Sequence, residues 1–151
     1  MTESDFKEVV KEIRKLFDEK PYKIEFIRRL LNEKQTLRRT FVAVLLQNPA
    51  RLGEIKERVF FSKNALYSYL YKLREIGLLE KISIMNIWNK KNLENEEKEV
   101  LQKFEEWTKT MASGQLQYFA GRTNYWALTD LGRDTKILNW VFKLERELKN
   151  G

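Results

Sequence analysis

Apolar residues recur at helical spacing along the first 47 positions of the chain. Residues 4–19, 22–33 and 36–47 each place apolar side chains three or four positions apart, a pattern that predicts three amphipathic helices. The second half of the third segment is apolar nearly all round, so we expect this helix to be buried. Asn48-Pro49 ends the pattern, because proline cannot continue a helix.

Two further helical segments follow and are joined by a tight turn. Residues 50–58 carry one apolar stripe, and Ser62 is well placed to cap a helix over residues 63–76. Gly77 comes next, where a glycine suits the left-handed backbone that ends many helices. The sequence therefore predicts a short helix, a turn and a capped helix in succession.

The second half of the chain mixes strand-like and helical patterns. β-branched residues and partial alternation predict strands, whereas apolar spacings of three or four predict helices. Ala-Gly-Arg-Thr at 120–123 suits a hairpin turn, and Thr129 or Asp130 is expected to cap the last helix. The predicted elements are strands over 78–88, 115–119 and 124–129, and helices over 94–111 and 131–148.

Composition narrows the range of functions. The chain has 151 residues, of which 42% are hydrophobic and 34% charged, and this balance favours one folded domain. It contains no Cys and no His, which excludes disulfides, thiol catalysis, zinc fingers and histidine general bases. The sequence has no glycine-rich phosphate loop and no nucleophile motif. We therefore expect neither a cofactor nor enzymatic activity.

Two further features of the sequence concern the setting of the protein. It has no run of about 20 apolar residues and no signal-peptide pattern, so we expect a cytoplasmic protein. Abundant Lys and Glu in a chain without Cys favour a thermophilic source.

Basic residues are concentrated in the middle of the chain. The net charge is +7, from 29 basic and 22 acidic side chains. Residues 41–93 hold nine basic and four acidic side chains, whereas residues 94–151 hold nine and ten. Such an excess is expected where a protein faces phosphates. The Arg38-Arg39 pair, just before this region, is expected either to touch a nucleic-acid backbone or to be solvated.

Four segments follow one another in an order that carries functional information. They are Leu52–Val59 after a buried helix, the capped segment Ser62–Ile76, LREIGLLEKI (Leu73–Ile82) leading into a strand, and YWALTDLGRD (Tyr125–Asp134) with its Leu-Thr-x-x-Gly turn. Residues 36–84 and 124–133 thereby resemble the winged-helix (winged helix-turn-helix) family of archaeal and bacterial DNA-binding transcriptional regulators. The resemblance covers about half of the chain.

The resemblance implies a mainly α fold with a small antiparallel β wing, and sequence-specific binding of double-stranded DNA. In this interpretation residues 1–34 form accessory N-terminal helices, 35–132 the DNA-binding domain and 133–151 a C-terminal helix. The sequence departs from the family pattern at the acidic segment 94–111, which lies between the first strand and the Leu-Thr-x-x-Gly strand. The wing is therefore expected either to carry an inserted helix or to be replaced by the 115–129 hairpin. Arg122, at the predicted hairpin turn, is therefore only a candidate for a wing contact.

The resemblance makes residues 62–76 the recognition helix. A B-form major groove is about 12 Å wide and accepts one α-helix. Asn64 and Ser68 lie one turn apart near the start of this helix, where base edges are usually read, and Lys63 and Lys72 suit phosphates. The predicted DNA-binding residues are Ser62, Lys63, Asn64, Tyr67, Ser68, Tyr71, Lys72 and Arg122.

Three tyrosines in this helix cannot all share one face. Tyr69 neighbours the inward leucines, so we expect it to be structural. Tyr67 and Tyr71 are expected to contact thymine methyl groups or phosphates, with a dimer contact as the alternative.

The terminal helices, over 4–33 and 131–148, carry apolar faces that a winged core does not need. We expect them to form a homodimer interface, because two recognition helices can then read half-sites about one duplex turn apart. The alternative is that they thicken a monomer.

The sequence leaves two alternative functions open. They are a winged-helix adaptor that binds protein, and a module that binds single-stranded nucleic acid through aromatic stacking.

Overall fold

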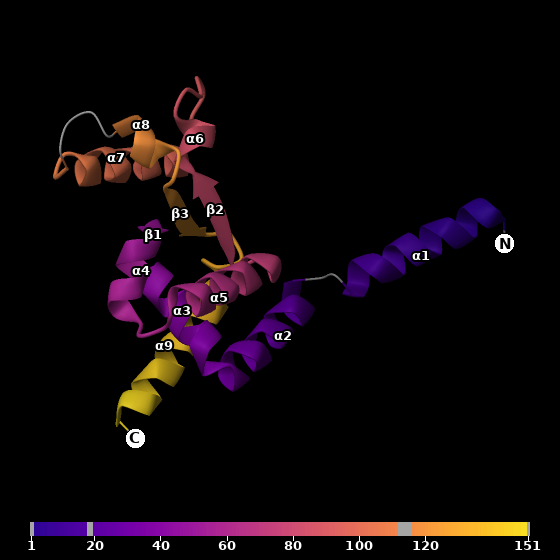
Figure 1. Cartoon of the computed structure of the whole chain (residues 1–151). Coiled ribbons are helices and arrows are strands. Elements are labelled where there is room, and N and C mark those ends of the chain that lie inside the picture. Colours follow the sequence, from indigo (N-terminus) through magenta and orange to yellow (C-terminus); the bar gives the residue numbers. More distant parts are fainter. Residues whose placement is uncertain (1, 18–19, 112–115, 151) are drawn as a thin grey trace.

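Helices surround a small antiparallel sheet in the protein (Figure 1). The structure is a computed structural model that describes residues 2–17, 20–111 and 116–150, with side chains described at 2–13, 24–111 and 118–148. None of the described helices is long and apolar enough to cross a lipid bilayer. The elements are α1 (Glu3–Phe17), α2 (Lys20–Glu33), α3 (Gln35–Gln47), β1 (Ala50–Arg51), α4 (Leu52–Arg58), α5 (Lys63–Glu75), β2 (Leu79–Ser83), α6 (Ile84–Ile87), α7 (Asn95–Thr108), α8 (Leu116–Ala120), β3 (Asn124–Leu128) and α9 (Thr135–Asn150).

Strand β3 is the central strand of the sheet. It pairs antiparallel with β1, where Ala50 lies opposite Trp126, and with β2 along the full length of both strands. Successive residues of a strand point to opposite faces. Trp126 accordingly belongs to one buried apolar cluster, and Tyr125 belongs to another. Both faces of β3 are therefore covered by protein.

The larger cluster lies between the sheet and the helices α2, α3, α4, α5 and α9. Its fully buried side chains include Phe41 of α3, and Leu66, Leu70 and Leu73 of α5. These leucines are spaced four and three residues apart, which places them on one face of α5. The predicted helix over 63–76 is thus confirmed, and its opposite face is left to solvent.

Arg38 lies inside this cluster with only 3% of its surface exposed. Its Nε donates a hydrogen bond to Glu145 at 2.8 Å, and its Nη1 donates to the carbonyl oxygen of Leu31 at 3.0 Å. Arg38 therefore joins α3 to α2 and α9, and both roles expected for it from the sequence are wrong. Arg39 is exposed.

The second cluster packs α6, α7 and α8 on the other face of the sheet. Val100 and Phe104 of α7 are fully buried, and the rings of Trp88 and Trp107 lie 5.8 and 6.2 Å from that of Phe104. Lys103 of α7 donates hydrogen bonds to the carbonyl oxygens of residues 47 and 49. The helix predicted over 94–111 therefore exists and belongs to the body of the protein.

Two strand predictions near this cluster need correction: the strand predicted over 78–88 is confirmed only over Leu79–Ser83, and the strand predicted over 115–119 is wrong. Residues 84–87 form the helix α6, because β2 runs out of partner at Asn124 and the two isoleucines of α6, three residues apart, are both buried in the second cluster. Residues 116–119 lie in α8, and residue 115 is outside the described residues. A hairpin strand there has no place to pair, because β1 and β2 already occupy both edges of β3.

The Leu-Thr-x-x-Gly turn connects the end of β3 to the end of α5 through hydrogen bonds. Gly77 adopts a φ of +88°, as expected for a helix C-cap. The hydroxyl of Thr129 donates to the carbonyl oxygen of Gly77 and accepts from the backbone N–H of Gly132 at 3.1 Å. A side chain at Gly132 would collide with the carbonyl oxygen of Leu78. This turn occupies 129–134, so α9 begins at Thr135 and not at the predicted position 131.

A half-buried carboxylate joins α7 to this turn. Burial and, after it, a hydrogen bond with the carboxyl group of Glu80 raise the pKa of Glu96 to about 7, and Arg133 acts in the opposite direction. The Nη2 of Arg133 lies 2.8 Å from the Glu96 carboxylate. Near neutral pH, Glu96 is therefore protonated in part of the molecules.

We expect this carboxyl group to make the protein less stable in alkali. Its pKa is raised on folding from 4.5 to about 7, so the folded state binds more protons in this interval and stability falls as pH rises through it. Urea unfolding at about pH 8 should show Glu96→Gln to be more stable than the parent by about 1 kcal/mol, reduced from the full shift because the site is partly solvated. The difference should vanish at about pH 4, below both pKa values. Glu99→Gln, on the exposed face of α7, is the control, and an equal gain in both variants would contradict the prediction.

Candidate nucleic-acid interface

Helix α5 presents one face to solvent beside the sheet. It begins after Ser62, whose hydroxyl oxygen accepts a hydrogen bond from the backbone N–H of Ala65 at 3.2 Å. Ser62 is therefore the helix cap, as its sequence position predicts. Its side-chain oxygen already has a partner within the protein.

Three of the predicted site residues form an exposed stripe along α5. Asn64, Ser68 and Lys72 are spaced four residues apart and are all exposed. No hydrogen bond or ion pair occupies their side chains within the described part of the chain. The amide, the hydroxyl and the ammonium group are therefore available to an outside partner.

A second stripe of α5, formed by Lys63, Tyr67 and Tyr71, leans toward the sheet. The rings of Tyr67 and Tyr71 stack with centroids 6.4 Å apart, and Tyr71 meets Trp126 edge to face at 5.5 Å. Lys81 of β2 donates a hydrogen bond to the hydroxyl of Tyr71 at 3.1 Å. Tyr71 is thus held against the sheet while 43% of its surface stays exposed.

Tyr69 has the structural role predicted for it. It packs against the larger cluster, and its ring meets that of Phe61 edge to face at 5.2 Å.

A basic hollow of about 210 Å3 lies between the start of α5 and the sheet. It brings together Lys63, Tyr67 and Arg122 from the predicted set. Drug-sized ligands occupy pockets of roughly 300–1,000 Å3, so this space suits a smaller group such as a phosphate. The residues that line it are Arg51, Leu52, Gly53, Lys63, Tyr67, Trp107, Arg122, Thr123, Asn124 and Trp126.

Arg51 is a site residue that sequence reasoning missed. It lies in β1 opposite Tyr125, and its guanidinium lies over the ring of Trp107 at 4.4 Å. A side chain at Gly53 would collide with this guanidinium, so the glycine leaves room for it. Only the pairing of β1 with β3 brings Arg51 to the hollow, and nothing in the local sequence indicates that pairing.

Arg122 belongs to the hollow but not to a hairpin tip. It follows α8, and its guanidinium lies over the ring of Tyr118 at 4.3 Å. The prediction that Arg122 stands at a turn between two strands is therefore wrong. Its approach to Lys63 is a result of the tertiary structure.

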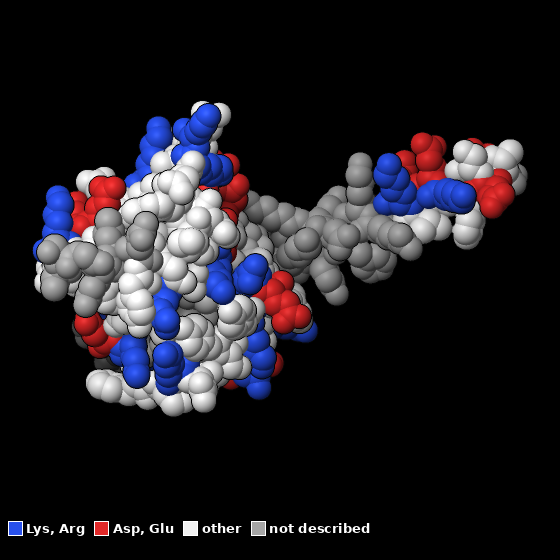
Figure 2. All heavy atoms as spheres, turned by 45° about the horizontal axis from the view of Figure 1, so that its top comes forward, with Lys and Arg blue, Asp and Glu red and all other residues white. Residues whose placement is uncertain are grey.

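The hollow gathers positive charge with little compensation. Arg51 faces the carboxylate of Glu54 at 4.0 Å, whereas neither Lys63 nor Arg122 forms a salt bridge with another described residue. Elsewhere, Lys and Arg side chains are spread over the visible face of the body without forming one continuous patch (Figure 2). Cations collected at one hollow can bind an anion by charge and by directed N–H groups.

The described residues contain no group of three or more acidic side chains placed to hold a metal ion. No family model matches the chain, and no curated protein or solved structure is significantly similar to it.

Proposed function

We propose that the protein is a winged-helix regulator that binds double-stranded DNA, with α5 as the recognition helix in the major groove. The observation that carries the proposal is the basic hollow, because Arg51, Lys63 and Arg122 meet beside the exposed stripe of α5. Phosphate contacts fix the position of such a protein on the duplex, and side chains on the helix then read bases.

The order of elements also supports this function. The succession α3, β1, α4, α5, β2, β3 and the sheet order β1-β3-β2 agree with a helix-turn-helix followed by a two-stranded wing. In this proposal α6, α7 and α8 replace the loop at the tip of the wing. The hollow then lies where the base of the wing meets the recognition helix.

The proposal is tested by measuring binding to a random-sequence duplex and to its separate strands as salt is raised. We expect binding to the duplex to be tighter and to weaken steeply with salt, because each neutralised phosphate releases counterions. Selection of sites from random duplexes should then yield a recurring sequence. Absence of binding at low salt, or tighter binding to the single strands, would contradict the proposal.

Within the exposed stripe we expect Asn64 and Lys72 to act differently. Asn64→Ala should lower affinity for the selected site by about 1–3 kcal/mol and relax the base choice at one position, because an amide can bind adenine through two hydrogen bonds. Lys72→Ala should weaken binding to all duplexes alike and reduce the salt slope by roughly one unit. Binding titrations on selected and scrambled sites distinguish these effects. Parent-like binding by both variants would exclude α5 as the reading helix.

A module for single strands is a second candidate, favoured by one contact. Tyr118 is 55% exposed and carries the guanidinium of Arg122 on its ring. An exposed aromatic ring beside a cation is typical of surfaces on which bases stack. In this case Tyr118→Ala should weaken binding to single strands more than binding to the duplex.

A further inference from the structure

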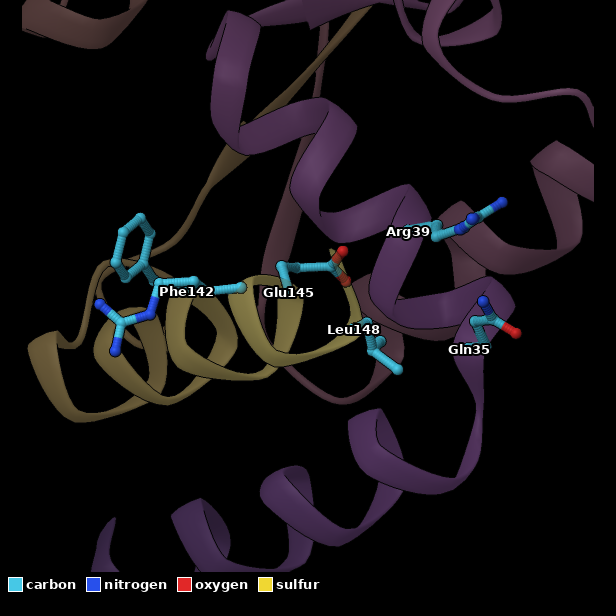
Figure 3. A pocket seen from close by; sticks show the side chains of 6 residues that line it. Gln35, Arg39, Phe142, Glu145 and Leu148 are labelled. Atoms are coloured by element: carbon cyan, nitrogen blue, oxygen red, sulfur yellow. The ribbon is translucent and has the colours of Figure 1, made fainter. Parts of the chain in front are cut away.

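An apolar groove with a basic rim runs between α3 and α9. Two hollows of about 670 and 360 Å3 share Arg39 and Glu145 and so form one continuous groove. Phe142 and Leu148 of α9 line one end of it. Figure 3 shows Glu145 reaching from α9 toward the part of α3 that carries Arg39. Leu46 and Phe60 line the other end.

Large apolar side chains in this groove are left exposed to solvent by the rest of the chain. The exposed fractions are 67% for Phe142, 60% for Leu46 and 100% for Phe60. Exposed apolar patches of this kind mark surfaces that bind a partner. Three arginines, Arg39, Arg58 and Arg146, line the groove, and its carboxylate, Glu145, is already bonded to Arg38.

Helix α1 carries an exposed apolar face and several acidic residues, which suit the apolar floor and the arginines of the groove. It extends away from the body in both views (Figures 1 and 2), and Figure 1 places the C-terminus on the opposite side of the molecule. Phe6, Val9 and Ile13, spaced for one helix face, are 60%, 42% and 47% exposed. The four acidic side chains of α1 all lie within its first ten residues, whereas two of its four basic residues, Arg14 and Lys15, follow them, so the first part of the helix is acidic although the whole helix is neutral. The predicted stripe continues to Leu16 and Phe17, whose side chains lie outside the described residues.

We propose that α1 of one molecule docks in the α3–α9 groove of a second copy, and that the two copies exchange their α1 helices. The apolar face of α1 then covers Leu46, Phe60 and Phe142, and its acidic residues meet the arginines of the rim. The lengths match, since α1 has 15 residues and α3 has 13, or about 22 and 20 Å at 1.5 Å per residue.

A second copy fits better than another occupant for two reasons. Helix α1 extends away from the body of its own chain (Figure 1), and no residue of α1 is among the described residues that line either hollow. A stable interface buries at least about 1,200 Å2, and reciprocal exchange makes the same contact twice. The inference does not depend on the proposed function, although such a dimer would carry two α5 helices.

The test measures the mass of the full chain in solution without DNA, by sedimentation equilibrium. We expect a dimer whose dissociation constant rises at least about 100-fold in Val9→Glu and in Phe142→Glu, because each puts a charge into an apolar contact. Both side chains are exposed, and circular dichroism should confirm that both variants fold. Met85→Glu, at an exposed apolar residue of α6, is the matched control and should dimerise like the parent.

Mixing the two variants identifies the exchange. We expect neither variant to pair with itself. In an equimolar mixture, however, the intact α1 of the Phe142→Glu chain can dock in the intact groove of the Val9→Glu chain, so we expect heterodimers to form. A crosslink tests the contact directly, because the chain has no Cys of its own. With Val10→Cys on α1 of one chain and Val42→Cys in the groove of another, we expect oxidation to join the two chains.

Three results would overturn the inference. The parent chain could be a monomer at high concentration. The dimer could be lost in Val9→Glu but kept in both Phe142→Glu and Leu46→Glu, which would show pairing of α1 with α1. The doubly substituted Val10→Cys/Val42→Cys chain could form its disulfide within a monomer, which would place α1 in its own groove. Each result is obtained without DNA, so failure here is distinct from failure of the proposed function.

Discussion

Phe104→Ala should lower the free energy of unfolding by about 3–5 kcal/mol, which is typical for truncation of a buried aromatic side chain. Phe104 is completely buried in the second cluster, where it touches Trp88 and Trp107. Domains of this size are stable by only about 5–15 kcal/mol, so the loss is a large fraction of the total. Urea unfolding followed by tryptophan fluorescence measures it.

The matched control is Glu105→Ala, at the next position of α7 and exposed. Surface substitutions of this kind change stability by about 0.5 kcal/mol or less. A loss of under 1 kcal/mol in Phe104→Ala would contradict the prediction, because it would mean that α6, α7 and α8 add little to the stability of the fold. If the parent chain unfolded in two steps, with one step at low urea, this would also mean that α6, α7 and α8 add little to the stability of the rest.

Replacement of Arg51, Lys63 and Arg122 together by alanine should lower affinity for every duplex by about 100-fold at 0.15 M salt. The reason is counterion release: for each phosphate that the protein neutralises, the logarithm of the binding constant falls by about 0.9 for each tenfold rise in salt concentration. Loss of three contacts should also flatten the salt slope by nearly three units. Fluorescence anisotropy with labelled duplexes over a range of salt concentrations measures both quantities.

The control for this triple variant removes the same charge elsewhere. Lys98, Lys136 and Lys143 are exposed, and they lie on α7 and α9 outside the lining of the hollow. Their replacement by alanine should weaken binding only slightly, because charges beyond a Debye length of about 8–10 Å are screened. Equal losses in the two triple variants would show that net charge matters and that the hollow does not.

Helix α7 contributes to both the stability of the fold and the candidate site. Its inner face completes the second cluster, and its Trp107 carries the guanidinium of Arg51. Arg51 in turn lines the basic hollow. The segment that departs from the winged-helix pattern thus supports a residue of the candidate site.

Local pattern in the sequence was sufficient to predict most helices. The helices α2, α3, α5 and α7 begin and end within three residues of their predicted bounds, because each has an apolar face of helical period and a breaker at an end. Ser62 and Gly77 act as predicted at the two ends of α5, since capping depends only on neighbouring residues. The exposure of Asn64, Ser68 and Lys72 follows from the same pattern, because the leucines of α5 fix its inner face.

Tertiary structure decided what depends on pairing and on distant neighbours. Residues 84–87 and 116–119 each include two β-branched or aromatic residues, yet both segments are helical. Beyond Ser83, β2 has no further partner on β3, and residues 116–119 find both edges of β3 occupied by β1 and β2. Arg38 is buried because Glu145, 107 positions later, lies beside it. Arg51 reaches Lys63 through the pairing of β1 with β3, and Arg122 reaches it from the segment between α8 and β3. Periodicity describes one element at a time, so it determined which face of α5 is free, while contacts between elements determined which charges stand beside that face.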